Sequence, residues 1–310
     1  MVVLGDLVLD VVLAADRRLE TGTDVPGRVA LCQGGSAANT ARWLGRLGVA
    51  TTLVTAVGRD GAGRTLVEAV RSDGVVVRAS RVVGRATGRV GVLVTPDGER
   101  SFVADRGAAD ALTAADLRPA WFVGIELLHL PVYSLLGDPL GAAGREAVRL
   151  ARAGGARVSL DLASVGPLLA GGRPAALDLV RAVAPDVLFA TTTELQALLG
   201  SGGRLAERAV AAGSGLAPIV VIKRGSKGAT VACRVGSEGA SLRFDVATKP
   251  IAATDTTGAG DAFDAGFIAG WLAARSAGRT LTAGLRQAAL AGHRAAARQV
   301  STRRPELPLR

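Results

Sequence analysis

Residues 255–267 read DTTGAGDAFDAGF, and this stretch indicates both the fold and the chemistry of the chain. Its small residues Gly258, Ala259 and Gly260 come just before an apolar helix that we expect to open at Asp261. They leave the first backbone N–H groups of that helix uncovered, and the helix dipole adds a positive potential at the same place. The sequence therefore predicts an anion hole for a phosphoryl group, with a glycine loop and an N-capping Asp261 as the plainer alternative.

A second glycine-rich segment, GGSAANTARWLGRLG, spans residues 34–48. Gly34 and Gly35 permit a close approach of the backbone to a ligand, and the amide of Asn39 lies one turn into the expected helix. This arrangement suits neutral hydroxyl groups better than a phosphate. A plain turn followed by an N-capping Ser36 explains the pattern equally well.

A third segment, GRDGAGRT at residues 58–65, is close to the P-loop pattern but has Arg64 where the pattern has Lys. The lysine of a P-loop acts as a compact point charge inside a backbone loop, and the planar guanidinium of arginine is a poor replacement. No Walker-B strand that ends in Asp clearly follows. We therefore interpret this segment as a structural turn from a strand to a helix.

Short apolar strands alternate with helices along most of the chain. The expected strands are 2–13, 51–57, 126–132, 157–162, 186–190 and 218–223, and the expected helices are 36–48, about 62–73, 139–155, about 261–275 and 281–299. This alternation, with strands that are almost wholly apolar, predicts a parallel sheet covered on both faces.

Two segments do not follow that alternation. Residues 14–33 are polar, and strands at 89–94 and 100–105 are joined around the turn Pro96-Asp97-Gly98. Both segments predict a small antiparallel element that projects from the main sheet. The sequence contains no linker, repeat or low-complexity tract, so we expect one domain with a β appendage.

The composition excludes several classes of protein. With 310 residues and 49% hydrophobic residues, the chain has ample material for a packed core. The net charge of +10 comes from dispersed arginines with only 3% aromatic residues, which argues against a nucleic-acid partner. Cys32 and Cys233 are far apart and predict small buried residues in a reducing compartment, not a disulfide or zinc site.

The N-terminal stretch is apolar but contains Asp6 and Asp10 and has no basic region before them. It therefore predicts a buried strand and not a signal peptide. No stretch approaches the length of about 18 uncharged apolar residues that a membrane span requires. We expect a cytoplasmic protein without a membrane partner.

Together these features resemble the ribokinase-like (PfkB) carbohydrate kinase family, over essentially the whole chain. Both signatures of that family occur in order, namely the Gly-Gly-x-x-x-Asn helix start at 34–39 and the DTTGAGD loop at 255–261. Further matching landmarks are Gly5, Asp10, Gly58-x-Asp60-x-x-Gly63, Arg106-Gly107-Ala108 and Gly225-Ser226-Lys227-Gly228.

The resemblance implies a three-layer α/β/α fold over residues 1–310, with a mainly parallel central sheet and a small β-sheet lid formed by about 11–33 and 83–106. It also implies transfer of the γ-phosphoryl group of ATP to a hydroxyl group, usually primary, of a sugar. Asp261 matches the base of the family, and Gly258, Ala259 and Gly260 match its N–H cradle. Hydroxyl recognition falls to Asp10, Gly34, Gly35 and Asn39.

For the nucleotide, the resemblance points to Lys223, Gly225, Gly228 and Gly260. His293 matches a position near the adenine, although a lone histidine on a helix is more often a core or surface residue. Glu194 matches an acid that holds magnesium-bound water, but Thr191 stands where the family has Asn.

The resemblance also suggests a monovalent cation, because Asp255 and Thr257 match positions used for it in potassium-dependent members. Stabilisation of the loop explains both residues equally well. A homodimer through the lid sheet is a further expectation from relatives.

The expected substrate is a small sugar or sugar acid of the ribose, fructose or 2-keto-3-deoxygluconate type. Arg106 would pair with the carboxylate of a sugar acid, or would be a solvated charge at a strand end. A nucleoside kinase is the alternative within the family, although the lid region offers only Phe102 to stack on a base. A non-catalytic nucleotide- or sugar-binding module is a further alternative, against which the intact GAGD loop with Asp261 argues.

Overall fold

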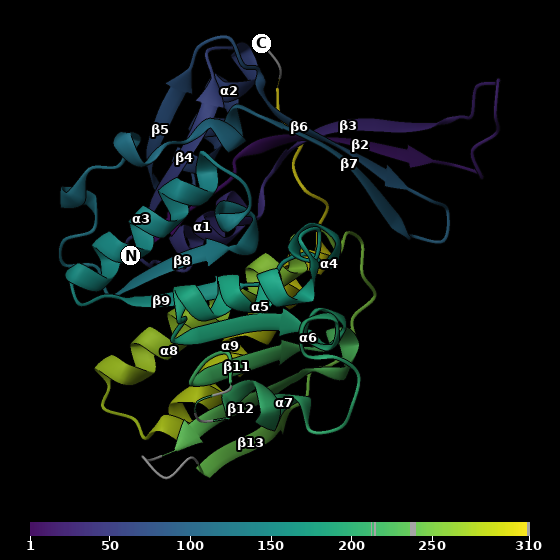
Figure 1. Ribbon diagram of the computed structural model, residues 1–310. Coiled ribbons are helices and arrows are strands. Elements are labelled where there is room, and N and C mark those ends of the chain that lie inside the picture. Colours follow the sequence, from purple (N-terminus) through teal and green to yellow (C-terminus); the bar gives the residue numbers. More distant parts are fainter. Residues whose placement is uncertain (212, 214, 236–239, 309–310) are drawn as a thin grey trace.

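Within the residues that the computed structural model describes (1–211, 213, 215–235 and 240–308), nine strands form a central sheet in the order β13-β12-β11-β10-β9-β8-β1-β4-β5 (Figure 1). These strands are β1 (Val2–Leu4), β4 (Thr52–Gly58), β5 (Val76–Val82), β8 (Leu127–Pro131), β9 (Arg157–Asp161), β10 (Val187–Thr191), β11 (Ile219–Lys223), β12 (Ala229–Val235) and β13 (Ala240–Val246). Neighbours are parallel from β5 to β11, and β12 and β13 add an antiparallel edge. The expected mainly parallel sheet is confirmed, whereas β5, β12 and β13 were not predicted.

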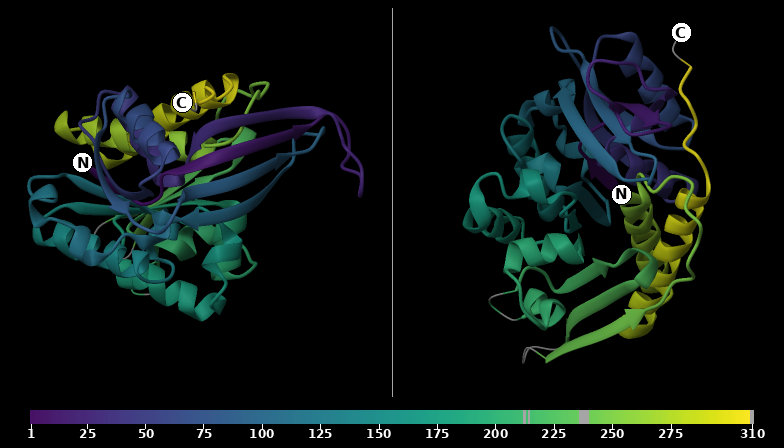
Figure 2. Two further views of the ribbon diagram at one scale, coloured as in Figure 1. Left: turned by 90° about the horizontal axis from the view of Figure 1, so that it is seen from above. Right: turned by 90° about the vertical axis from the view of Figure 1, so that its right-hand side faces the viewer.

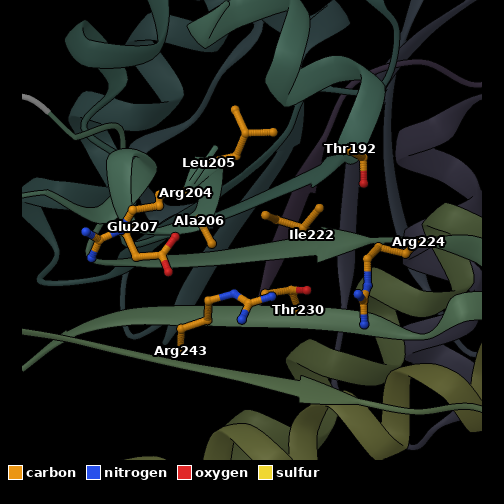
Figure 3. A pocket seen from close by; sticks show the side chains of 9 residues that line it. All are labelled: Thr192, Arg204, Leu205, Ala206, Glu207, Ile222, Arg224, Thr230 and Arg243. Carbon is orange, nitrogen blue, oxygen red and sulfur yellow. The ribbon is translucent and has the colours of Figure 1, made fainter. Parts of the chain in front are cut away.

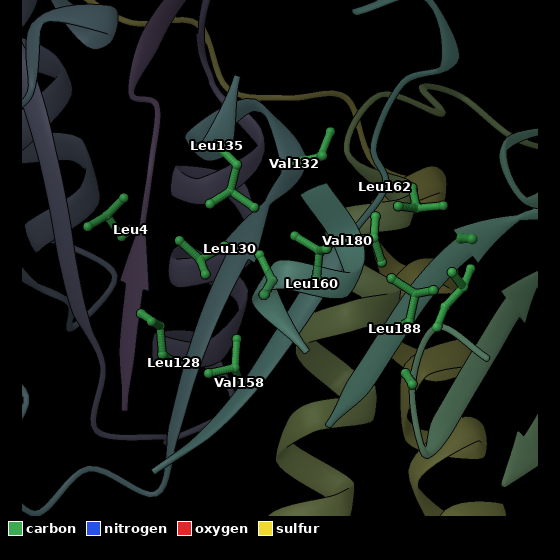
Figure 4. Close-up of a cluster of buried hydrophobic side chains, with 14 of the residues drawn as sticks. Leu4, Leu128, Leu130, Val132, Leu135, Val158, Leu160, Leu162, Val180 and Leu188 are labelled. Atoms are coloured by element: carbon green, nitrogen blue, oxygen red, sulfur yellow. The ribbon is translucent and has the colours of Figure 1, made fainter. Parts of the chain in front are cut away.

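Helices cover both faces of the central sheet. One face packs against α1 (Ser36–Arg46), α2 (Gly61–Arg71), α8 (Ala259–Ser276) and α9 (Leu281–Ser301), and the other against α3 (Leu140–Ala153), α5 (Gly172–Val183), α6 (Thr192–Leu199) and α7 (Leu205–Val210). A short helix, α4 (Val165–Leu168), precedes α5. Figure 4 shows the cluster on the second face, where Leu130, Leu160 and Leu188 of successive strands are completely buried. The strands are apolar on both sides because each side faces a helical layer.

A second, four-stranded sheet projects from this body (Figure 2). Its strands are β2 (Val8–Ala15), β3 (Gly27–Gly34), β6 (Thr87–Val94) and β7 (Arg100–Gly107), in the order β3-β2-β6-β7. The β2–β3 and β6–β7 pairs are antiparallel, as expected, but β2 and β6 run parallel. The prediction of a purely antiparallel element was wrong because two hairpins from distant segments join side by side.

The apolar N-terminal run is not the single strand 2–13 that its composition predicted. It divides into β1 in the central sheet and β2 in the projecting sheet. Between them, the carboxylate of Asp6 accepts a hydrogen bond from the backbone N–H of Ala37 at 3.1 Å, at the start of α1. This contact takes the chain out of the first sheet, and hydropathy alone could not reveal it.

The P-loop-like segment at 58–65 is the predicted structural turn between β4 and α2. Asp60 caps α2 by accepting the N–H of Gly63 at 2.8 Å, and it also accepts the N–H of Thr87 at 2.8 Å. The same carboxylate therefore ends one strand, starts a helix and anchors the projecting sheet.

Cys32 and Cys233 are both buried and free, as predicted. None of the helices in the described part of the chain has the length and apolar character needed to cross a membrane.

We predict that Gly266→Ala lowers the free energy of unfolding by about 1–3 kcal/mol, because overpacking forces helices apart. A Cβ atom on Gly266 of α8 would lie 2.6 Å from the carbonyl oxygen of Ala291 and 2.9 Å from the Cα of Gly292, both in α9. Urea denaturation measures the change.

The matched control is Gly91→Ala in β6, where the nearest atom to the new Cβ would lie 3.8 Å away. This variant should be unchanged or more stable by about 0.5 kcal/mol, since alanine is favoured over glycine inside a strand. An equal loss of stability in both variants would contradict the close packing of α8 on α9.

Candidate active site

A cavity of about 660 Å³ opens at the carboxyl ends of the central strands. Asp161, Thr191 and Lys223 line it from the ends of β9, β10 and β11, and the loop that begins α8 forms another wall. Phe102 contributes from β7 of the projecting sheet. Ligands of open α/β sheets bind at this edge, so the cavity is the candidate active site.

Asp261 lies in the first turn of α8, where it meets two side chains of α1. Ser36 donates its hydroxyl hydrogen to Oδ1 of Asp261 at 2.7 Å, and Asn39 donates its amide N–H to Oδ2 at 2.8 Å. The structure thus joins the two glycine-rich segments that the sequence singled out. The role of Ser36 was missed because its position suggested an N-cap, whereas Gly35 takes the N-cap position with a φ of 99°.

Burial in the cavity wall raises the pKa of Asp261 to about 7, and the nearby carboxylate of Asp161 adds to this rise. The hydrogen bonds from Ser36 and Asn39 and the charge of Lys223 oppose it, because they favour the ionised form. A carboxyl group with such a pKa near neutrality can hold or release a proton at working pH.

The loop before Asp261 has the geometry of an anion site, with one difference from the prediction. Gly258 has a φ of 74°, a left-handed conformation that favours glycine. The N–H of Ala259 donates to the carbonyl of Thr256 at 3.2 Å, so the prediction that it belongs to the open cradle was wrong. In the described part of the chain no acceptor contacts the N–H groups of Gly258, Gly260 and Asp261, and these three remain for an anion.

Lys223 lies under this loop, held by two carboxylates. Its ammonium donates to Asp161 at 2.9 Å and to Asp264 at 3.1 Å, and these charges raise the pKa of Lys223 despite its burial. Burial raises the pKa of Asp264 well above its ordinary value. A Cβ on Gly260 would lie 3.3 Å from the ammonium nitrogen.

The ammonium of Lys223 has three N–H donors, of which the two carboxylates use two. The sequence predicted Lys223 for the nucleotide but gave no sign of its partners. Asp161 looked like the end of an apolar strand, and Asp264 was hidden inside the apolar run of α8.

The expected nucleotide-binding residues lie along the same cavity. Gly225 and Gly228 line it from the loop between β11 and β12, both with positive φ, at 58° and 87°. His293 of α9 also lines it, bonded through Nε2 to the carbonyl of Val246 at 3.1 Å, with its ring edge on Phe263.

Glu194 lines the cavity at the start of α6, inside a capping box with Thr191. The N–H of Thr191 donates to the Glu194 carboxylate at 2.7 Å, and the N–H of Glu194 donates to the Thr191 hydroxyl at 3.2 Å. Thr191 thus caps the helix at the position where the family has Asn. Magnesium is held by one or two carboxylates together with substrate phosphates, and Glu194, which lines the same cavity as the anion loop, fits that pattern.

The residues expected to bind the sugar lie at the base of the projecting sheet. Asp10 of β2 is buried against Gly34, whose Cβ would lie only 2.0 Å from Oδ1 of Asp10. Its other oxygen accepts from Arg304 of the C-terminal tail at 2.5 Å, a contact that the sequence did not predict.

Arg106 is not the solvated strand-end charge that the sequence offered as one reading. Its Nε donates to Asp110 at 2.7 Å, its Nη1 lies 3.3 Å from Asp6, and its guanidinium carbon lies 4.9 Å from the ring centre of Tyr133. Its Nη2 is buried, and none of the described residues accepts a hydrogen bond from it.

A second cavity of about 360 Å³ lies between α7 and the strands β11 to β13 (Figure 3). Arg204, Arg224 and Arg243 line it together with Glu207. It contains neither the glycine-rich loops nor Asp261, so the chemistry assigned above belongs to the larger cavity.

The sequence matches the pfkB family carbohydrate kinases over residues 1–309. It is 33% identical over 308 residues to the ATP-dependent ribose-1-phosphate kinase of Halopiger xanaduensis, covering 96% of this chain and 93% of that protein. It is 31% identical over 272 residues to the fructokinase of Klebsiella pneumoniae, covering 86% of this chain and 83% of that protein.

Solved structures share the fold. The apo form of a putative ribokinase II from E. coli matches with a TM-score of 0.79 and 25% identity, covering 98% of this chain and 93% of that one. A putative ribokinase II from E. coli in complex with ATP and Mg²⁺ matches with a TM-score of 0.78 and 23% identity, with the same coverage.

We predict that Asp261→Asn is more stable than the native chain at pH 8, by on the order of 1–2 kcal/mol. The folded pKa of about 7 lies above the ordinary 3.8, so the folded state holds a proton that the unfolded state has lost between these values. The stability of the native chain therefore falls as pH rises through this window, and the uncharged variant does not share the fall.

Urea denaturation at pH 4.5, 6 and 8 tests this prediction, with Asp178→Asn on the exposed side of α5 as the control. The extra free energy of unfolding of Asp261→Asn over the native chain should become smaller as the pH falls. The control should differ from the native chain by the same amount at every pH. A gain that stays constant with pH would mean that the Asp261 carboxyl is not held near neutrality.

Proposed function

Because the chain belongs to the pfkB family of carbohydrate kinases, we propose that it transfers the γ-phosphoryl group of ATP to a primary hydroxyl group of a sugar or sugar acid in the larger cavity. The family and its kinase-named relatives make the chain a phosphotransferase with an alcohol acceptor, of the sugar or nucleoside kinase class. The observation that carries the proposal is the Asp261 carboxylate, held by Ser36 and Asn39 beside open N–H groups of α8.

In the proposed reaction Asp261 orients the acceptor hydroxyl and takes its proton. Ser36 and Asn39 occupy one lone pair on each carboxylate oxygen and so fix the direction of the others. Because the transition state of phosphoryl transfer is loose, correct placement of the hydroxyl contributes more than strong basicity.

The charge on the transferring group would be met by the N–H groups of Gly260 and Asp261, together with the dipole of α8. The ammonium of Lys223 beneath the loop adds a fixed positive charge, oriented by Asp161 and Asp264. Magnesium bound with ATP supplies further charge neutralisation on the phosphates, and Glu194 is proposed to hold it through a bound water.

The projecting sheet is proposed as the lid of the site. Arg100 of β7 donates to the hydroxyl of Thr256 and lies 3.5 Å from the carboxylate of Asp255, so this sheet already contacts the anion loop. A lid that closes over the cavity would keep water from the phosphoryl group.

Arg106 supports a sugar that carries a carboxylate or a phosphate. Its buried Nη2 has an unused N–H pair, and its guanidinium stacks on Tyr133, which lines the cavity. An anionic group on the substrate would satisfy these donors in a charge-assisted hydrogen bond. The similarity to a ribose-1-phosphate kinase is consistent with this class.

A nucleoside is the second candidate acceptor. Phe102, Tyr133 and Phe263 all line the cavity, so the site offers more aromatic surface than the Phe102 that the sequence offered for stacking on a base.

We predict that Asp261→Asn lowers kcat by about 10²–10⁴-fold, the usual contribution of a positioned general base. ATP affinity, measured by isothermal titration calorimetry, should change little because Asn keeps the size of the side chain and the backbone N–H groups. Near-native turnover by this variant would refute the role of Asp261.

We further predict that a panel of sugars, sugar acids, sugar phosphates and nucleosides with Mg-ATP, followed by ADP release, gives its highest kcat/KM with a sugar or an anionic sugar. Arg106→Ala should reduce kcat/KM for the anionic substrates about tenfold or more relative to neutral sugars, because the loss of one charge-assisted hydrogen bond destabilises the transition state by about that factor. Arg81→Ala, at an exposed position of β5, is the matched control. A nucleoside as the clear best substrate would replace the sugar assignment.

A further inference from the structure

The two residues that the family resemblance assigns to a monovalent cation are already occupied by N–H donors. The carboxylate of Asp255 contacts Nε of Arg304 at 3.2 Å through Oδ2, and Nη2 of Arg100 at 3.5 Å through Oδ1. The backbone N–H of Thr257 also donates to Oδ1 of Asp255, at 2.9 Å. All three of these contacts are with donors, and two of the donors are guanidinium groups.

The backbone carbonyl of Thr257 is engaged in the same way. It accepts a hydrogen bond from Nε2 of Gln299 at 2.9 Å, while Oε1 of Gln299 accepts from the indole N–H of Trp43 at 2.9 Å. The indole can only donate, so the oxygen of the Gln299 amide must face Trp43 and its NH₂ group must face Thr257.

These contacts do not fit a potassium ion. Such an ion needs oxygen atoms with several lone pairs turned towards it, and here N–H donors already contact both oxygens of the Asp255 carboxylate and the Thr257 carbonyl, so fewer lone pairs are left for a cation. The Arg304 side chain is only 9% exposed, so little water separates its charge from a cation placed beside Asp255, and the two would repel each other.

The Arg304 guanidinium also links three parts of the site. Its Nη1 contacts the carboxylate of Asp10 at 2.5 Å and the carbonyl of Gln33 at 3.5 Å, while its Nε contacts Asp255. Asp10 belongs to β2 of the projecting sheet, and Asp255 precedes the anion loop. One cation thus contacts the buried carboxylate of Asp10 and the partly exposed carboxylate of Asp255, and so links the loop to the sheet.

The segment that carries Arg304 is itself docked. The C-terminal tail leaves α9 and passes the base of the projecting sheet (Figure 2, right). There the N–H of Leu307 donates to the carbonyl of Leu31 in β3 at 2.8 Å, and Glu306 forms an ion pair with Arg28.

We propose that Arg304 is a built-in cation that takes the place of a monovalent metal ion, so that this kinase positions its anion loop without potassium. Arg304 acts as a positioning residue through Asp255, and Gln299 completes the replacement at the Thr257 carbonyl. The inference rests on the proposed kinase function only where turnover is the readout.

The first test compares the native enzyme in about 100 mM KCl and in about 100 mM choline chloride, which have equal ionic strength and equal screening of charges. We expect kcat values within about twofold of each other, a difference too small to reflect a lost positioning contact. Activation by potassium of about tenfold or more would overturn the proposal.

The second test compares Arg304→Ala with Arg303→Ala, which removes the exposed neighbouring arginine of the same tail. In choline chloride, Arg304→Ala should lose about 10–100-fold in kcat because the loop is misplaced, while Arg303→Ala stays close to native. KCl or about 20 mM guanidinium chloride, too dilute to denature, should restore part of the activity of Arg304→Ala alone. Equal activities of the two variants, or a loss that neither cation reduces, would refute the positioning role.

A third readout needs no turnover. KCl should raise the thermal unfolding midpoint of Arg304→Ala relative to choline chloride, and should leave that of the native chain unchanged, because only the variant has an open cation site. A potassium-dependent rise in the native chain would overturn the proposal even if no acceptor substrate were found. If Arg304→Ala does not fold, the native-chain measurements in the two salts decide alone.

Discussion

The candidate site depends on keeping the Asp261 carboxylate in the cavity wall, beside uncovered N–H groups of α8, without letting a cation neutralise it. Ser36 and Asn39 hold Asp261 through neutral donors, which orient it while its pKa stays near 7. The nearest ammonium, on Lys223, is directed to Asp161 and Asp264. A direct ion pair between Lys223 and Asp261 would favour the charged form so strongly that the carboxylate would become a poorer base. By directing the ammonium of Lys223 away from Asp261, Asp161 and Asp264 therefore help to keep the pKa of Asp261 raised.

Parallel topology explains how residues so far apart in sequence reach one place. Asp161, Thr191 and Lys223 end three adjacent strands, and the carboxyl ends of parallel strands share one edge of the sheet. The α1 and α8 helices pack on the same face, which brings their first turns together at that edge. The antiparallel β12 then returns from the edge, so the loop with Gly225 and Gly228 closes the cavity wall.

The sequence predicted those features of the fold and the site that depend on residues close together in the chain. The glycines before Asp261 and those before Asn39 determine the backbone conformation at the start of each helix. Apolar strands that alternate with helices require a parallel sheet with both faces covered. Hydropathy could not separate β1 from β2, because both strands are apolar and the residue between them, Asp6, bonds to the distant start of α1. Arg304 was invisible for a similar reason. An arginine in a polar tail resembles the chain's other dispersed arginines until the fold places it between Asp10 and Asp255.

An arginine tethered to the chain differs from a bound metal ion in what controls its occupancy. A metal ion leaves its site when its concentration falls, whereas a guanidinium on a docked tail is present at a high local concentration at all times. Its presence instead depends on the pairing of the tail with β3, through Leu307 and Glu306. A movement of the projecting sheet therefore acts directly on the cation that holds Asp255. In this arrangement the projecting sheet and the loop before α8 share one charge, so the position of Asp10 and the position of Asp255 are set together.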